Sequence, residues 1–205
     1  VKIASYDCSA LLFLEKISTL NKPMIVSTGA SRKKEIIQAA KLLEKRLHAF
    51  LHCVTIYPTN LNQFHLSRME FLYSLSNSVG FSDHSLAARD DIKGSLCAIY
   101  LGATTIERHF TILASDQTRD GPVSINKKQF NKLKNFSNLS KENQLSYLNE
   151  LGINIKELQG DKDRVLSKEE LLNRDYYRGR FINKIDNNIV YNWEDSAREL
   201  LNYKG

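Results

Sequence analysis

Short apolar runs alternate with segments whose apolar residues recur every three or four positions along the first two thirds of the chain. A run such as 22–30 (KPMIVSTGA) predicts a buried strand, and a segment such as 36–47 predicts a helix with one buried face. Regular alternation of the two indicates a parallel sheet with helical crossovers. Strands are predicted at 1–5, 22–30, 49–59, 78–85 and 103–110, and helices at 11–20, 36–47, 66–72, 86–101 and 130–136.

Each predicted strand ends in hydroxyl, carboxylate or imidazole side chains. In a barrel of parallel strands all carboxyl ends meet at one mouth, whereas an open sheet gathers them only at a switch point. Five such ends favour an α/β fold that is a partial TIM (β/α) barrel, with about five of its eight strand–helix units, over a doubly wound sheet. The chain begins on a strand at Val1 without a Met, so we expect about three further strands upstream.

The pattern changes after residue 137. We predict two parts: the C-terminal portion of a barrel at 1–137, and a short α/β tail at 138–205 that is a helical linker followed by a hairpin. Ser167 and Glu170 have the spacing of a helix capping box. Residues 179–193 (GRFINKIDNNIVYNW) predict the hairpin, and 194–203 predict a last short helix.

Charge, apolar runs and cysteine content exclude several classes of function. The chain carries a formal charge of +6, but aromatic residues do not interleave with Lys and Arg as in nucleic-acid-binding motifs, so no nucleic-acid partner is expected. No apolar run approaches the roughly 18 residues of a membrane span, and no signal-peptide pattern is present. The three cysteines form no metal or disulfide pattern, which favours a reducing, cytoplasmic location.

Two histidines are the strongest candidates for functional residues. His84 and His109 each follow an apolar strand, and the two strands are consecutive in the alternation. Two imidazoles with oxygen ligands suit a divalent first-row ion such as Mn²⁺. The spacing equally fits two hydrogen-bonding histidines at a polar rim, and it leaves both interpretations open.

Two carboxylates lie beside these histidines. Strand alternation places Glu107 and His109 on one side and Arg108 on the other. Glu107 could act as an acid/base or hold a water, and Asp83 could orient a histidine or a substrate hydroxyl. Either carboxylate could instead be a salt-bridge partner.

An anion site is a further possibility. The turn 27–29 (STG) precedes a predicted helix, where backbone N–H groups can bind an anion, although most such turns only cap helices. Lys2 lies in an otherwise apolar strand. If it faces a barrel interior it needs an anionic partner, and if it is a frayed terminal residue it needs none.

Taken together, the segments KIAS, PMIVSTGAS, LHCVTIYPT, GFSDHS and GATTIERHF resemble, in order and spacing, the sialic acid synthase family of N-acetylneuraminate, pseudaminic and legionaminic acid synthases. The resemblance covers about residues 1–137. It implies a TIM barrel that condenses phosphoenolpyruvate with an N-acylated amino sugar, releasing phosphate, with Mn²⁺ or Mg²⁺ as cofactor. It also implies a homodimer for the full-length protein.

The resemblance further implies roles for individual residues. His84 and His109 would ligate the metal. Tyr57 would lie near both substrates, and Glu107 beside the sugar. Tyr57 and Glu107, together with Asp83 from its place beside His84, are the predicted catalytic residues. The predicted substrate-binding residues are Lys2, Ser5, Ser27, Thr55, Ser82 and Asp120.

Three departures from the family pattern matter. The family's N-terminal half, with its acid/base glutamate and a second phosphate-binding lysine, is absent, so we expect the isolated chain to be inactive. Thr55 stands where Asn is usual, and the segment 118–124 (TRDGPVS) replaces the usual Pro-Gly-Pro-Asp loop. Asp120 could substitute for the sugar-contacting aspartate of that loop.

Two other functions stay open on the sequence alone. The chain could be a non-catalytic remnant that binds sugar phosphates or a partner chain, or it could belong to a different metal-dependent aldolase barrel.

Overall fold

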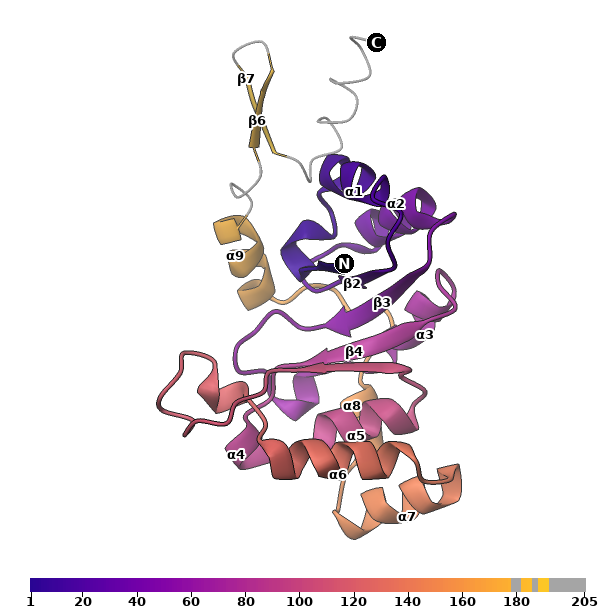
Figure 1. The fold of residues 1–205 in the computed structure, drawn as a ribbon, viewed down its shortest axis with the longest axis vertical. Coiled ribbons are helices and arrows are strands. Elements are labelled where there is room, and N and C mark those ends of the chain that lie inside the picture. Colours follow the sequence, from indigo (N-terminus) through magenta and orange to yellow (C-terminus); the bar gives the residue numbers. More distant parts are fainter. Residues whose placement is uncertain (178–181, 186–187, 192–205) are drawn as a thin grey trace. The chain divides into compact units, whose positions relative to one another are not determined.

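The computed structural model describes residues 1–177, 182–185 and 188–191. The chain forms two compact units. Figure 1 draws the helices and strands of both. Unit 1 comprises residues 1–50 and 165–205, and unit 2 comprises residues 51–164. Strand β3 (His48–Cys53) begins in unit 1 and ends in unit 2, and each unit is described by itself below.

Unit 1 builds its sheet from β1, β2 and the first half of β3, in that order. β1 pairs in parallel with β2, with Lys2 opposite Ile25 and Ile3 opposite Val26. Helices α1 and α2 pack against each other beside these strands. The elements of unit 1 are β1 (Lys2–Ile3), the 3-10 helix η1 (Ser5–Asp7), α1 (Leu11–Ser18), β2 (Met24–Ser27), α2 (Lys33–Leu43), α9 (Lys168–Tyr177), β6 (Ile182–Ile185) and β7 (Asn188–Tyr191).

The sheet of unit 2 consists of the second half of β3, then β4 and β5, in that order. Helix α5 packs on β4 and β5, and α6 and α7 pack on α5, as the stacked helices of Figure 1 show. The elements of unit 2 are η2 (Leu61–Gln63), α3 (Arg68–Tyr73), β4 (Val79–Asp83), α4 (Ala87–Asp90), α5 (Lys93–Tyr100), β5 (Thr105–Arg108), η3 (Gly121–Val123), α6 (Lys127–Ser137), α7 (Lys141–Glu150) and α8 (Ile155–Gln159).

The unit 2 core explains why β4 begins with apolar residues. Val79 and Phe81 are fully buried, and Phe81 packs edge-on against Phe64 with ring centroids 5.0 Å apart. Gly80 is required because a Cβ there would lie 2.1 Å from the carbonyl oxygen of Thr105 on β5. Close strand contact and burial on both faces are typical of a parallel sheet covered by helices.

The predicted α/β class with five strand–helix units is confirmed. Two local predictions are wrong. The helix predicted at 86–101 is two helices, α4 and α5, because Asp91 has a positive φ of 50° that ends the first. The helix predicted at 36–47 ends at Leu43, and Leu47 lies beyond it with 75% of its surface exposed.

Two local predictions for the tail agree with the described residues. Ser167 and Glu170 form the predicted capping box at the start of α9. β6 and β7 form an antiparallel hairpin, with Ile185 paired to Asn188. The turn residues 186–187 and the helix predicted at 194–203 lie outside the described residues. Within the described part of the chain, no helix is both long enough and apolar enough to span a bilayer.

Candidate functional site

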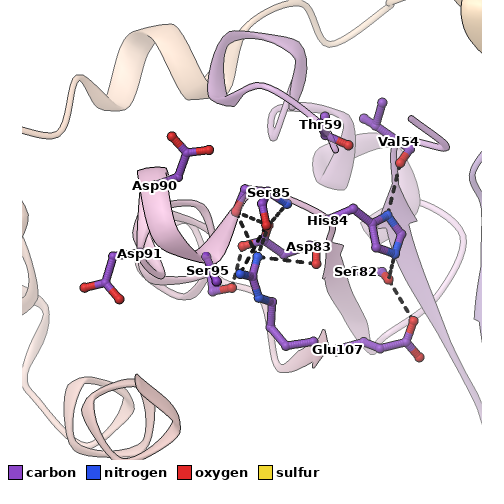
Figure 2. Close-up of polar contacts among 12 residues, drawn as sticks. Val54, Thr59, Ser82, Asp83, His84, Ser85, Asp90, Asp91, Ser95 and Glu107 are labelled. Carbon is purple, nitrogen blue, oxygen red and sulfur yellow. Dashed lines mark hydrogen bonds and ion pairs between the residues drawn. The ribbon is translucent and has the colours of Figure 1, made fainter. Parts of the chain in front are cut away.

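The ends of β4 and β5 place two rows of side chains opposite each other in unit 2. The strands pair in register, with Ser82 opposite Glu107 and Asp83 opposite Arg108. Because side chains alternate along a strand, the two pairs lie on opposite sides of the sheet. Figure 2 shows Ser82 and Glu107 on the side of the His84 ring, with Asp83 turned away from it toward Ser85 and Ser95.

Ser82 and Glu107 form one contact of the site. The Ser82 hydroxyl donates to Glu107 Oε1 at 2.7 Å, which fixes one carboxylate oxygen. Ser82 is buried and Glu107 is half-buried. The expected orientation of Glu107, away from the side that Arg108 faces, is therefore confirmed.

The His84 imidazole is held in one tautomer. Its Nδ1 lies 3.2 Å from the carbonyl oxygen of Val54, which can only accept, so Nδ1 carries the proton. Nε2 is then an acceptor, and the hydroxyl of Tyr57 donates to it at 2.7 Å. Burial lowers the pKa of His84 below its ordinary value, so the ring is neutral near pH 7. An unprotonated Nε2 on a neutral ring is what a metal ligand requires.

His109 lies directly after β5 and faces the same site. Its ring centroid is 5.6 Å from that of His84, and the ring planes are nearly perpendicular at 85°. Burial lowers the pKa of His109, and the nearby His84 lowers it further, while Asp120 opposes the shift. Asp120 Oδ2 lies 3.9 Å from His109 Nδ1, which is too long for a hydrogen bond.

Tyr57 covers the two histidines. Its ring stacks on His84 at a centroid distance of 4.0 Å and meets His109 edge-on at 6.0 Å, while half of its surface stays exposed. The predicted cluster of Tyr57, Ser82, His84, Glu107 and His109 is thus brought together in unit 2.

A shallow cavity of about 290 Å³ adjoins His109. Asp120 and Arg119 line it from the loop before η3, together with Thr111. Asp120 therefore lies next to His109. Thr55, also predicted to bind substrate, is buried just after β3.

Unit 1 holds the three other predicted substrate-binding residues. Lys2 Nζ donates to the Ser27 hydroxyl at 2.9 Å and to the Ile3 carbonyl at 3.0 Å. Ser5 and Ser27 are buried. An ammonium group beside a hydroxyl at the end of β2 has the chemistry of a phosphate or carboxylate site.

Asp83 does not contact the histidines as a catalytic group would. Its side chain is fully buried, and its carboxylate is occupied by the Ser85 backbone N–H, the hydroxyls of Ser85 and Ser95, and an ion pair with Arg108. Sequence reasoning missed Arg108 and both serines. Aligning the two strand ends, Ser-Asp-His with Glu-Arg-His, places Asp opposite Arg and is a signal that finds the ion pair.

The residues present fit a divalent metal in part. His84 and His109 offer two neutral imidazoles on one side of the sheet. Among the described residues no group of three or more His, Cys, Asp and Glu side chains could hold an ion. Any ion held here would therefore take its remaining ligands from water or substrate oxygens.

Known proteins resemble this chain in sequence. The sequence model of the NeuB family matches residues 1–144. The N,N'-diacetyllegionaminic acid synthase of Campylobacter jejuni is 38% identical over 127 residues, which are 59% of this chain and 36% of the relative. The pseudaminic acid synthase of Helicobacter pylori is 32% identical over 197 residues, which are 92% of this chain and 54% of the relative.

Two solved structures share the fold. The spore coat polysaccharide biosynthesis protein SpsE of Bacillus subtilis superposes with a TM-score of 0.66 at 27% identity, over 82% of this chain and 47% of that one. The N-acetylneuraminic acid synthetase of Leptospira borgpetersenii, solved with citrate, superposes with a TM-score of 0.60 at 27% identity, over 86% of this chain and 56% of that one. The chain spans about half the length, or less, of the curated relatives it matches.

Proposed function

Because this chain belongs to the NeuB family, we propose that it is part of an enzyme that condenses phosphoenolpyruvate with an N-acylated amino sugar. The products are a nonulosonic acid and inorganic phosphate. The names of the relatives, a legionaminic acid synthase and a pseudaminic acid synthase, support this reaction class. The observation that carries the proposal is the pair of neutral imidazoles of His84 and His109 beside the Ser82–Glu107 contact.

The two histidines are assigned as ligands of Mn²⁺ or Mg²⁺. When bound, the ion supplies Lewis acidity to the aldehyde oxygen of the open-chain sugar. The Val54 carbonyl keeps the proton of His84 on Nδ1, so Nε2 stays available as a donor atom. Tyr57 covers this position, and its hydroxyl moves from Nε2 to a substrate oxygen when the site is filled.

The bond changes are those of an aldol-type condensation with loss of phosphate. The π electrons of phosphoenolpyruvate form a bond from its methylene carbon to the aldehyde carbon of the sugar, and the aldehyde C=O opens to an oxygen that takes up a proton. Water adds to the electron-poor C2 and gives up a proton. The C2–O bond to the phosphate then breaks as the C2 hydroxyl loses its proton to become the ketone, and phosphate leaves. Glu107, oriented by Ser82, is the acid/base assigned to the acceptor side.

Substrate binding is assigned to the remaining residues. Lys2, Ser5 and Ser27 bind the phosphate and carboxylate of phosphoenolpyruvate, because an ammonium with hydroxyl donors suits these anions. Thr55 and Ser82 contribute further hydroxyls. Asp120, at the cavity beside His109, binds hydroxyls of the amino sugar.

A cytoplasmic location, which rests on the cysteine pattern, remains a prediction. A homodimer of the full-length enzyme, which rests on the family resemblance, is a prediction as well.

Phosphate release tests the proposed reaction. Phosphoenolpyruvate, Mn²⁺ and a panel of N-acylated amino sugars are offered to this chain and to any longer product of the same gene. We expect phosphate release that requires the amino sugar, is lost in His84→Ala and His109→Ala, and is kept in His48→Asn as a matched control outside the site. We expect it from the longer product and not from the chain alone.

Phosphate release that does not need the acceptor, or that survives both histidine substitutions, would contradict the assignment. Binding of sugar phosphates without turnover in every product would favour the alternative of a non-catalytic remnant.

A further inference from the structure

A buried ion pair lies under the two candidate metal ligands. Asp83 at the end of β4 pairs with Arg108 at the end of β5, and their side chains are 0% and 3% exposed. A buried ion pair is weak evidence for stability, because removing two charges from water offsets their attraction. The buried Arg108 Nε also makes no hydrogen bond with the described residues. The pair therefore calls for an explanation other than stability.

The Asp83–Arg108 pair makes hydrogen bonds to the peptide groups on both sides of His84. Asp83 Oδ1 accepts from the Ser85 N–H at 2.9 Å, which fixes the peptide that follows His84. The Arg108 guanidinium donates to the Asp83 carbonyl oxygen at 3.4 Å, in the peptide that precedes His84, and to the Ser85 carbonyl oxygen at 3.4 Å. It also donates to the Ser85 hydroxyl at 2.8 Å. Both peptide groups that carry His84 are thus held by this one pair.

The same pair also fixes the backbone that carries His109. Arg108 immediately precedes His109, and its side chain is anchored on the side of the sheet opposite Glu107. Because neighbouring side chains in a strand point to opposite sides, fixing Arg108 fixes the rotation of the backbone that presents Glu107 and His109. A rotation of either strand end would separate the two imidazoles.

We propose that Asp83 and Arg108 are positioning residues that set the orientation of His84 and His109 relative to each other for metal binding. This inference deepens the proposed function and rests on its metal site. It sharpens the prediction that Asp83 orients a histidine, because Asp83 and Arg108 would act on both histidines through the backbone. The role resembles that of the outer partners of metal ligands, whose loss typically costs about 10–100-fold in metal affinity.

The chain offers a matched control on the same carboxylate. The Ser95 hydroxyl of α5 donates to the other oxygen of Asp83, Oδ2, at 2.6 Å. That bond ties the carboxylate to the helix but touches neither peptide beside His84 (Figure 2). Ser95→Ala therefore removes one hydrogen bond of the Asp83 carboxylate and keeps the hydrogen bonds to the peptide groups beside His84.

Two measurements on the full chain test the inference. The first is Mn²⁺ affinity, read from the electron paramagnetic resonance signal of free Mn²⁺ during titration. The second is the ring tautomer of His84 without metal, read from long-range ¹H–¹⁵N correlations of the imidazoles. The test variant is the double substitution Asp83→Leu with Arg108→Met, because apolar residues of similar volume often replace a buried ion pair without loss of stability. Arg108→Lys serves as a second variant that keeps the charge but loses the forked donors.

We expect the double variant to remain folded, to lose at least tenfold in Mn²⁺ affinity, and to lose the single Nδ1-protonated form of His84. Arg108→Lys should lose affinity by a smaller factor, and Ser95→Ala should match the wild type within twofold. A folded double variant with wild-type affinity and an unchanged His84 tautomer would overturn the inference. If the double variant does not fold, wild-type affinity in Arg108→Lys overturns it instead.

The outcome also separates this inference from the proposed function. If the wild-type chain binds no Mn²⁺, the metal assignment fails, and the tautomer of His84 alone then decides whether the pair positions the ring.

Discussion

Burial keeps His52 uncharged on β3. Its ring is 2% exposed, and Nε2 donates to the carbonyl oxygen of Phe64 at 2.6 Å. Removal from water lowers the pKa of His52 from 6.5 to about 3. The neighbouring Cys53 points to the other face, toward Nδ1 of His84 at 3.8 Å. The two side chains therefore lie on opposite faces of β3 and cannot act as one catalytic dyad.

The lowered pKa of His52 predicts a pH-dependent stability. The unfolded chain takes up a proton near pH 6.5, whereas the folded chain does so only near pH 3. The contribution of neutral His52 to the free energy of unfolding is therefore complete above pH 6.5. It is lost as the pH falls from 6.5 toward 3, by up to about 1.4 kcal/mol per pH unit. Urea unfolding between pH 7 and 4.5 measures it. His52→Gln, which keeps an amide donor for Phe64, should show a shallower decline, and equal declines in both chains would contradict the prediction.

At the scale of single elements, Gly94 lets α5 lie close to the β4 strand end. A Cβ on Gly94 would lie 2.1 Å from Phe64 Cε2 and 3.0 Å from Asp83 Oδ2. The helix thereby brings Ser95 within reach of the Asp83 carboxylate. A glycine inside a helix lowers its propensity, so its presence here is explained by packing.

Gly94→Ala should therefore destabilise the chain by about 1–3 kcal/mol, although alanine is the better helix former. Phe64→Leu shortens the side chain that the new methyl group would strike. In that background the cost of Gly94→Ala should be smaller, which a double-mutant cycle of urea unfolding measures. Strictly additive effects of the two substitutions would argue against the close contact.

Helix α9 is attached to unit 1 by a second buried ion pair. The Arg174 guanidinium pairs with the Glu35 carboxylate on α2 and donates to the Ala30 carbonyl oxygen at 2.6 Å. Glu35 also accepts from the Arg32 backbone N–H at 2.7 Å, which caps α2. The rings of Tyr6 and Tyr177 stack at 4.2 Å. Residues far apart in the sequence are thus joined in unit 1.

Arg174→Met should cost about 3–5 kcal/mol, because it leaves the buried Glu35 carboxylate without its charged partner. The measurements are urea unfolding and amide hydrogen exchange along α9, which should become faster. Lys168→Ala, at an exposed position of the same helix, should stay within about 0.5 kcal/mol of the wild type. Unchanged exchange in Arg174→Met would show that other contacts hold α9.

For the whole molecule, the order of strands and helices could be predicted because strands buried by helices read as apolar runs between amphipathic segments. The break between α4 and α5 at Asp91 could not be predicted, because a single residue with positive φ leaves no periodic signal in the sequence. Helix α8 was also missed, since five residues are too few to show a period.

The candidate site divides in the same way. His84, Glu107 and His109 could be predicted because strand ends of a parallel sheet gather polar residues. Aligning the two strand ends gives the pairing of Asp83 with Arg108. It does not give the proposed positioning role, because that role depends on the burial of both charges, which leaves no signal in the sequence.

The central claim is that this NeuB-family chain binds a divalent metal through His84 and His109. Titration of the chain with Mn²⁺, followed by electron paramagnetic resonance, tests it most directly. We predict one bound ion, at least a tenfold loss of affinity in His84→Ala and in His109→Ala, and wild-type affinity in His48→Asn. Equal affinity in the wild type and both alanine variants would contradict the account.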